Sequence, residues 1–392
     1  MAVIDKIAAH HAEMTAWRRD LHAHPEIGFE EVRTSGIVAE KLASWGIEVT
    51  TGIAGTGVVG TIRGRGPGNR AIGLRADMDA LPMQEGNDFA HASQNPGKMH
   101  ACGHDGHTTM LLGAARYLAE TRNFAGTVQL IFQPAEEGAG GASRMIAEGL
   151  FERFPVDAVY GVHNWPGMPV GTFGLRPGPM MASVDNFTIT ITGRGGHAAM
   201  PHLTVDPIIA AGHVLVGLQT LVSRNVNPND AGVVTVGAIH GGEAHNVIPQ
   251  HVELRGTVRT LAAATRDLLE RRVTELVTGI AASLGATAKV EYERGFPVLV
   301  NAAAETEFAA QTAATILGGK GVIRDAGPVM GAEDFAFMLE RKPGAYAFIG
   351  QGDGGLCSNS VHNQHYDFND GILPIGATYF AALVESALPL AA

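Results

Sequence analysis

Apolar runs of strand length alternate with helical patterns over the first 165 residues, and this alternation is the feature that most constrains the fold. Residues 71–75, 128–132 and 158–162 are each predicted to form a short buried strand. Residues 107–120 carry apolar side chains at helical spacing, and a helix rich in small residues is expected to end near Leu150. Strands that alternate with helices are typical of a parallel sheet covered by helices. The predicted fold class is therefore α/β.

Acidic and histidine side chains follow each of these three predicted strands. Asp77 and Asp79 follow the first, Glu136 and Glu137 the second, and His163 the third. Ligands bind beyond the carboxyl ends of the strands in open α/β sheets. We therefore expect these side chains to lie together and to form a site.

The adjacent pair Glu136 and Glu137 indicates a bound cation. Like charges this close resist being ionised together, and a metal ion removes that cost. One carboxylate then binds the metal while the other remains free to handle protons. The alternative is a solvated surface loop.

Cys102 and His104 lie two residues apart in a glycine-containing loop that leads into a predicted helix. Thiolate and imidazole suit zinc and its first-row neighbours and are poor ligands for calcium or magnesium. The alternative is a buried structural cysteine beside a helix-capping histidine. We expect a further ligand from the C-terminal region, where spacing does not separate His362 from His365.

The pattern changes at about Val184, where apolar and polar residues begin to alternate. Strands are predicted near residues 187–191, 233–240, 252–260 and 288–293, with helices over 205–221 and 265–284. This β-α-β-β-α-β order is typical of a ferredoxin-like unit. We therefore predict an inserted domain at 184–293 within a main domain formed by 1–183 and 294–392.

Composition excludes several classes of protein. A net charge of −11 argues against a nucleic-acid or anionic-membrane partner, because both require a basic surface. The opening residues 3–21 predict an amphipathic helix rather than a signal peptide. The most apolar helical stretch, 207–222, is interrupted by His213 and Gln219 and is not predicted to cross a membrane. Two cysteines cannot form a disulfide framework, so the expected location is the reducing cytoplasm.

Six segments, in this order, resemble the M20 metallopeptidase family along nearly the whole chain. The resemblance is closer to the amidohydrolase branch, which contains hippurate hydrolase, N-acyl-L-amino-acid amidohydrolase and the auxin-conjugate hydrolases. The segments are residues 75–82, 100–107, 133–138, 161–165, 331–335 and 362–368.

The resemblance implies a zinc-exopeptidase-like catalytic domain interrupted by a lid and dimerisation domain. It also implies two divalent metal ions, which could be Zn, Mn, Co or Ni, with Glu136 as general base. Many peptidases of the wider family carry a histidine where this chain has Asp77 and a bridging aspartate where it has Cys102. Asp77 is therefore not counted as a ligand, and Asp79 is expected to orient a ligand histidine. The implied ligands are Cys102, His104, Glu137, His163 and His362, with Cys102 bridging the two ions.

The resemblance further implies roles for residues of the inserted domain. His197 is expected to stabilise the oxyanion, and in the family the equivalent histidine comes from the partner subunit; the alternative is an exposed loop histidine. Asn246 and Arg259 are candidates for binding the substrate carboxylate, although a strand arginine can also be a surface charge. We expect a homo-oligomer, dimer or tetramer, formed through this domain.

In the main domain, Glu333 and Asp334 either shape the pocket or form an acidic pair favoured at a helix N-terminus.

The predicted function is metal-dependent hydrolysis of the amide bond of a small-molecule N-acyl amino acid. The products would be a carboxylic acid and a free amino acid. One alternative is a dipeptidase or aminopeptidase of the same fold, although no acidic anchor for a free α-amine is evident. A second alternative is a non-catalytic metal-binding or ligand-binding relative.

Overall fold

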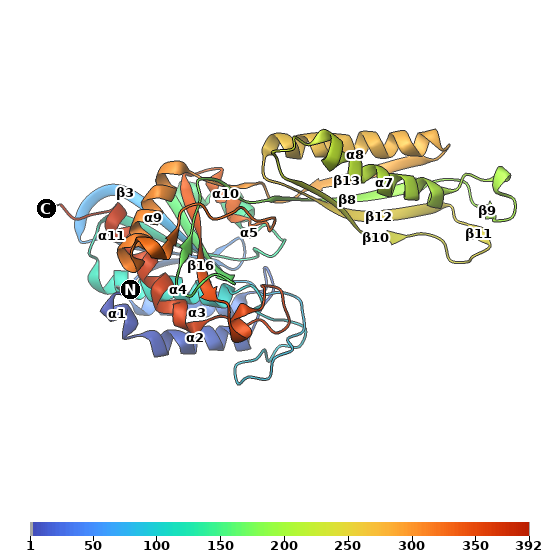
Figure 1. The fold of residues 1–392 in the computed structure, drawn as a ribbon. Coiled ribbons are helices and arrows are strands. Elements are labelled where there is room, and N and C mark those ends of the chain that lie inside the picture. The colour runs from blue at the N-terminus through green and yellow to red at the C-terminus, as the bar shows by residue number, and fades with distance from the viewer. Residues whose placement is uncertain (1–2, 392) are drawn as a thin grey trace. The chain divides into compact units, whose positions relative to one another are not determined.

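The computed structural model describes residues 3–391 and divides into two compact units (Figure 1). Unit 1 comprises Met1–Met180, Val300–Gly327 and Asp334–Ala392, and unit 2 comprises Met181–Leu299 and Pro328–Glu333. The chain therefore leaves unit 1 a second time for six residues and re-enters it at Asp334.

Unit 1 is built around an eight-stranded sheet, and the predicted α/β fold class is confirmed. The strand order is β1-β2-β4-β3-β5-β16-β6-β15, and the four central strands, β4, β3, β5 and β16, are parallel. These strands are β1 (Glu48–Ile53), β2 (Gly57–Arg63), β3 (Gly66–Asp77), β4 (Ala125–Gln133), β5 (Ala158–Pro166), β6 (Phe173–Gly174), β15 (Val322–Ile323) and β16 (Gly344–Gly352). Two short strands outside this sheet, β7 (Gly178–Met181) and β14 (Leu299–Asn301), pair with each other.

Strand β3 lies at the point where the connections of the sheet change direction. The chain passes from β3 through helix α4 to β4 on one side, and then returns through α5 and α6 to β5 on the other side of β3. Such a switch point opens a crevice at the carboxyl ends of the strands, and ligands bind there. The topology therefore favours a binding site beyond Asp77, at the end of β3.

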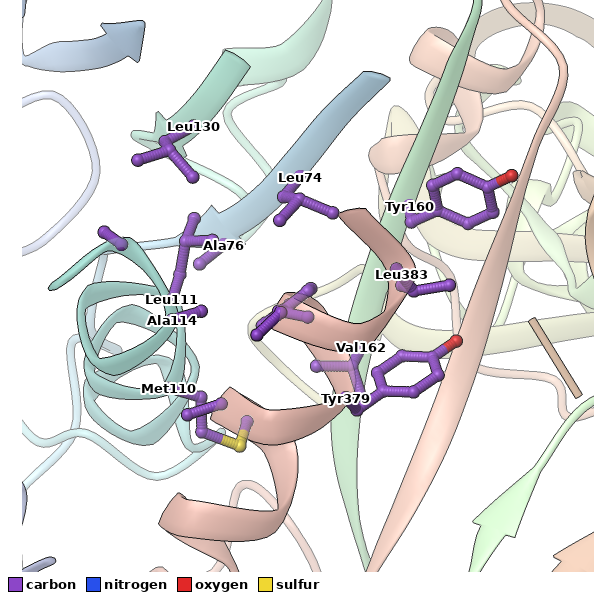
Figure 2. Packing of buried hydrophobic residues seen from close by; sticks show 14 of the residues in the cluster. Leu74, Ala76, Met110, Leu111, Ala114, Leu130, Tyr160, Val162, Tyr379 and Leu383 are labelled. Atoms are coloured by element: carbon purple, nitrogen blue, oxygen red, sulfur yellow. The ribbon is translucent and has the colours of Figure 1, made fainter. Parts of the chain in front are cut away.

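The core of unit 1 lies where α4 and α11 pack against each other and against β3. Figure 2 shows Leu111 of α4 and Leu383 of α11 with Leu74 of β3, and all three are fully buried. The helices of this unit are α1 (Asp5–Ala8), α2 (His11–Ala23), α3 (Val32–Ser44), α4 (His104–Thr121), α5 (Gly141–Ala147), α6 (Leu150–Arg153), α9 (Ala303–Leu317), α10 (Phe335–Leu339) and α11 (Leu373–Ala387), with 3-10 turns at Gly319–Gly321, Gly355–Ser358 and Asp370–Ile372.

The prediction of a single N-terminal helix over residues 3–21 is wrong, because two helices cover this region. The structure divides it into α1 and α2, with a break at Ala9 and His10. Ile7, Met14 and Leu21 are all buried and are spaced seven residues apart. Because this spacing continues across the break, the apolar periodicity does not reveal it.

Unit 2 contains a four-stranded antiparallel sheet with order β10-β12-β8-β13. Its elements follow one another as β-α-β-β-α-β, the order predicted from the alternating pattern. Helices α7 and α8 pack together, and the core combines their apolar residues with those of the sheet. The elements are β8 (Ser183–Thr192), α7 (Pro207–Asn225), β10 (Gly232–His240), β12 (His251–Thr260), α8 (Ala263–Ser283) and β13 (Thr287–Arg294), with the short strands β9 (Gly196–His197) and β11 (Val247–Ile248) and a 3-10 turn at Pro201–Leu203.

Within residues 3–391, every helix is too short or too polar to span a bilayer.

Candidate metal centre

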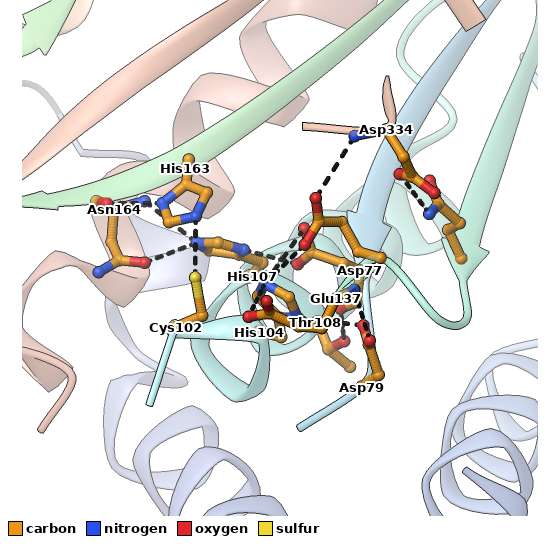
Figure 3. A network of polar contacts seen from close by, with 12 residues as sticks. Asp77, Asp79, Cys102, His104, His107, Thr108, Glu137, His163, Asn164 and Asp334 are labelled. Carbon is orange, nitrogen blue, oxygen red and sulfur yellow. Dashed lines mark hydrogen bonds and ion pairs between the residues drawn. The ribbon is translucent and has the colours of Figure 1, made fainter. Parts of the chain in front are cut away.

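Thiol, imidazole and carboxylate side chains converge near the carboxyl ends of β3 and β4 and at His163, within β5 (Figure 3). Cys102, His104 and His163 offer ligand atoms that all lie within 4.8 Å of one another. Cys102 also forms such a group with Glu137 and His362. Cys102 therefore belongs to two groups of potential ligands.

The neighbouring elements explain this convergence. Cys102 precedes α4, and His104 is the first residue of that helix. Glu136 and Glu137 follow the end of β4, as the pattern predicted. The expectation that His163 ends its strand is wrong, because β5 continues to Pro166. Pairing with β16 extends it: His163 lies opposite Phe348, and the ladder runs on to Pro166.

Gly103 lets the loop approach β5 closely. Its φ is +94°, a conformation that side chains other than glycine rarely adopt. A Cβ at this position would lie 2.1 Å from Asn164 Oδ1 and 2.7 Å from the Tyr366 hydroxyl. Glycine is therefore required here to bring Cys102 and His104 to the site.

Asp79 orients His104 and the segment of Glu137 together. The His104 Nδ1–H donates to Asp79 Oδ1 at 3.2 Å, and the Glu137 backbone N–H donates to Asp79 Oδ2 at 2.9 Å. His104 Nε2 consequently points at the carboxylates, 4.0 Å from both Glu136 Oε2 and Glu137 Oε1. This is the arrangement that a carboxylate behind a metal-binding histidine produces.

His163 directs a ring nitrogen that can act as an acceptor toward Cys102. Its Nδ1–H donates to the backbone carbonyl of Asn164 at 2.7 Å, because a carbonyl can only accept. The other nitrogen, Nε2, therefore lies unprotonated 3.4 Å from Cys102 Sγ. Burial and the nearby imidazole of His107 hold the pKa of His163 well below its usual value, which favours the neutral form of this potential ligand.

The site carries a negative charge that calls for a cation. Burial opposes a positive charge on His104, but the carboxylates of Asp77 and Asp79 outweigh burial and raise its pKa to about 10. Burial and the carboxylates of Glu137 and Glu136 raise the pKa of the Cys102 thiol well above its usual value. A thiolate can exist in this position only beside a compensating positive charge.

Two buried atoms support the fit to a divalent metal. Within residues 3–391, His104 Nε2 and Glu137 Oε1 have no hydrogen-bond partner, and each belongs to a group of potential ligands. Buried polar atoms are nearly always hydrogen-bonded, so an unpaired nitrogen and an unpaired oxygen that face each other fit the binding of a cation. The thiol, imidazole and carboxylate set matches first-row divalent metals.

The geometry separates His362 from His365. His362 Nε2 lies 3.3 Å from Glu137 Oε1, and the His362 backbone N–H donates to the Ala101 carbonyl at 2.7 Å. The His365 ring instead packs near Gly86, where a Cβ would lie 2.6 Å from its Cε1. His362 is thus the histidine that joins the group of potential ligands.

Two site residues adopt positive φ although they are not glycine: Ala135, at +56°, and His362, at +66°. Residues held in this region cost free energy and persist where the surrounding structure fixes them, often at functional sites. The Ala135 backbone N–H donates to Glu31 Oε1 at 2.8 Å, which stabilises the turn that presents Glu136.

Asp77 lies beside the site, but its oxygens are already engaged. Oδ2 accepts from Arg75 Nη1 at 2.7 Å, and Oδ1 accepts from His107 Nδ1 at 2.6 Å. His107 in turn contacts Asn164 Oδ1 through Nε2 at 2.8 Å. Asp77 therefore supports the site through a hydrogen-bond network, and it also forms a group of potential ligands with His104 and His107.

The remaining predicted residues belong to unit 2. His197 is exposed on β9, where it lies opposite Val247 of β11. Asn246 precedes that strand, and its backbone carbonyl accepts from Ala198 N at 3.1 Å. Arg259 is half-buried on β12. The structure thus brings His197 and the Asn246 segment together within this unit.

Sequence analysis assigned no role to Arg75, His107, Gln133 or Asn164, all of which are buried in the polar network of the site. Arg75 carried a detectable signal, since it is a charged residue in an otherwise apolar strand, and such a residue must have partners. His107, Gln133 and Asn164 lie within the motifs, but no local pattern indicates their contacts.

Comparison with known proteins agrees with this geometry. The sequence model of peptidase family M20/M25/M40 matches residues 73–386. Hippurate hydrolase of Campylobacter jejuni is 43% identical over 383 residues, which cover 98% of each chain. N-acetyl-L-cysteine deacetylase of Bacillus subtilis is 42% identical over 371 residues, which cover 94% of this chain and 86% of the relative.

A solved structure also matches nearly the whole chain. It is a Bacillus subtilis protein described as a dinuclear metal-binding peptidase of the M20 family. It superposes with a TM-score of 0.85 at 36% identity, covering 98% of this chain and 100% of that one. The chain described here belongs to peptidase family M20/M25/M40, and within that family to its amidohydrolase branch.

Proposed function

We propose that this protein hydrolyses the amide bond of N-acyl amino acids and releases a carboxylic acid and a free amino acid. The observation that carries the proposal is the position of Glu136. Its carboxylate lies beside two groups of potential metal ligands, and these two groups share Cys102. The relatives named for hippurate and N-acetylcysteine hydrolysis support the same class of substrate.

Five residues would hold two divalent ions in each subunit. His104 and His163 would bind one ion, Glu137 and His362 the other, and Cys102 both. Bound divalent ions would polarise the amide carbonyl and lower the pKa of a water molecule. The ligand chemistry favours Zn, Mn, Co or Ni over Ca or Mg.

Glu136 would act as general base and then as general acid. Its Oε1 accepts a hydrogen bond from the Asp334 backbone N–H at 3.3 Å, while Oε2 faces His104 Nε2. Oε2 is thus positioned to take a proton from the attacking water and to return it to the leaving amino group. Asp79 would keep His104 in the required tautomer.

His197 has the chemistry of an oxyanion donor. Its Nδ1 accepts a hydrogen bond from the Ala199 backbone N–H at 3.1 Å, so Nε2 carries the ring proton and is available to donate. This exposed N–H would stabilise negative charge on the amide oxygen, in its own subunit or in a partner's.

Arg259 and Asn246 would bind the substrate carboxylate. Within the described residues, the Arg259 guanidinium makes neither an ion pair nor a hydrogen bond, although the residue is half-buried. Burial lowers the pKa of its guanidinium, a sign that a negative partner would be favourable there. The Asn246 side chain is exposed and available.

We further propose a homo-oligomer, dimer or tetramer, formed through unit 2. Strand β10 is an edge of its sheet, and Ile209 and Val216 on α7 are 55% and 73% exposed. Unpaired strand edges and exposed apolar side chains both favour association.

The free thiols of Cys102 and Cys357 suit a reducing, cytoplasmic location.

Replacing Glu136 with Gln tests the assignment of the general base. The change preserves shape and removes the basic oxygen, so we expect kcat to fall by about 10²–10⁴. Metal content, measured by elemental analysis, should stay equal to that of the wild type. Full turnover by Glu136→Gln would contradict the proposed mechanism.

A further inference from the structure

A fully buried arginine occupies the carboxyl end of β3. Arg75 is 1% exposed, and its guanidinium reaches at least three neighbours. Nε donates to Gln133 Oε1 at 2.8 Å, Nη1 to Asp77 Oδ2 at 2.7 Å, and Nη2 to Asp334 Oδ1 at 3.1 Å. Since a buried charge is costly unless it is fully paired, this arrangement fixes the positions of its partners as well as its own.

Asp334 is held through both of its carboxylate oxygens. Oδ1 accepts from Arg75 and from Gln133 Nε2, the latter at 2.7 Å. Oδ2 accepts from the Ala142 backbone N–H, at the start of α5, at 2.9 Å. Donors from β3, β4 and α5 therefore fix the residue at which the chain re-enters unit 1 after residues 328–333.

The backbone of Asp334 carries this constraint to Glu136. The Asp334 N–H donates to Glu136 Oε1 at 3.3 Å, as Figure 3 shows for the labelled Asp334. The donor occupies one carboxylate oxygen and leaves Oε2 directed at the potential metal ligands. A proton acceptor must be held to within a fraction of an ångström of its working position.

We propose that Arg75 and Asp334 are positioning residues for the Glu136 general base. Arg75 fixes the Asp334 carboxylate, and Asp334 then places its backbone N–H so that Glu136 offers Oε2 to the attacking water. This inference rests on the proposed function, in which Glu136 is the base. It explains why a buried arginine and aspartate are coupled beside the site, although neither belongs to the proposed set of ligands.

Asp334→Asn is the first test. One oxygen becomes an NH2 group that must face either the Arg75 and Gln133 donors or the Ala142 N–H, so residue 334 has to shift. We expect kcat to fall by about 10–100-fold, because small misplacement of a catalytic group has effects of this size. KM should change by less than about threefold, and metal content should match the wild type, because substrate and metal ligands are untouched. The lysine in Arg75→Lys cannot reach three partners at once. This variant should also lower kcat while leaving KM nearly unchanged, with a smaller fold-change in kcat.

A double-mutant cycle separates positioning from general stabilisation. Glu136→Asp shortens the base and retracts it from the Asp334 N–H. If Asp334 acts through Glu136, adding Asp334→Asn to Glu136→Asp should lower kcat by less than about threefold. An equal loss in both backgrounds would overturn the proposal.

A matched control removes another buried hydrogen bond from the same sheet. Gln129→Ala breaks the hydrogen bond that Thr61 Oγ1 donates to Gln129 Oε1 at 2.6 Å. Gln129 lies on β4, four residues before Gln133. It should lower the melting temperature without changing kcat. An unchanged kcat in folded Asp334→Asn would overturn the proposal, and so would unfolding of both Asp334→Asn and Arg75→Lys while Gln129→Ala stays folded.

Failure of the proposed function would look different. The wild type would then cleave no N-acyl amino acid, whereas failure of the positioning proposal leaves wild-type hydrolysis and the Glu136→Gln loss intact.

Discussion

At the residue scale, the site depends on conformations and contacts that few side chains allow. Gly103 turns the chain between two proposed ligands, and Ala135 and His362 hold positive φ beside or within the ligand set. Asp79 shows how one carboxylate serves two proposed metal-binding residues at once, since its two oxygens fix the His104 ring and the Glu137 backbone. The geometry of the centre is thus set by residues around the ligands as much as by the ligands.

Gly103→Ala should destabilise the protein and reduce its metal content. The new methyl group would meet Asn164 and Tyr366 in a backbone conformation that disfavours alanine. We expect a loss of about 2–4 kcal/mol in the free energy of unfolding, from backbone strain together with overpacking.

Gly97→Ala provides the matched control. Gly97 has a φ of +76°, and among the described residues no atom lies within 4 Å of the position that a Cβ would take there. The free energy of unfolding of Gly97→Ala should therefore fall only by the cost of backbone strain, about 1–2 kcal/mol, and the variant should keep its metal. Equal losses in the two variants, measured by urea unfolding, would contradict the steric argument.

At the element scale, helix α2 is tied to the segments that carry the proposed ligands. Arg18 Nη1 donates to Asp367 Oδ1 at 2.8 Å, and Arg18 Nε donates to Asp370 Oδ1 at 2.6 Å, both following His362 in the chain. His22 contacts Asp105 at 2.8 Å, next to His104, and Glu85 at 3.2 Å. Helix α2 therefore stabilises both the start of α4 and the segment that follows His362.

The His22 contacts predict a pH dependence of stability. Burial lowers the pKa of His22, but the hydrogen bonds to Asp105 and Glu85 outweigh it and raise the pKa from 6.5 to about 9. Because the folded pKa exceeds the unfolded one, this stabilisation is fully present below about pH 6.5. It is lost as the pH rises through about 9, and it amounts to about 3 kcal/mol.

Urea unfolding of the wild type and His22→Asn at pH 6, 7.5 and 9.5 measures this contribution. Asparagine does not titrate, so the wild type should be more stable than the variant at pH 6 and should lose most of that advantage by pH 9.5. A difference that stays constant over this range would show that folding does not raise the pKa of His22.

At the scale of the whole molecule, the sequence predicts the fold class and the neighbourhood of the site well. Alternation of strands and helices predicts the parallel sheet, and the predicted strand ends place Asp79, Glu136 and His163 in one neighbourhood without knowledge of the strand order, although β5 continues beyond His163. The β-α-β-β-α-β order of unit 2 follows from periodicity alone.

Contacts between distant segments are what the sequence does not predict. Arg75 and Asp334 are 259 residues apart, and their pairing follows from packing at the end of β3 rather than from a local pattern. The choice between His362 and His365 likewise depends on which ring the loop directs at Glu137. The break between α1 and α2 escapes detection because apolar spacing continues across it.

The most direct test of the account is hydrolysis of a substrate panel by chelated enzyme that is re-supplied with Zn, Mn, Co or Ni. The panel contains hippurate, N-acetyl amino acids and unblocked dipeptides. We predict metal-dependent cleavage of the acylated substrates and none of the dipeptides. Cleavage of dipeptides alone would identify a peptidase, and no cleavage of any substrate by metal-loaded enzyme would contradict the assignment as an amidohydrolase.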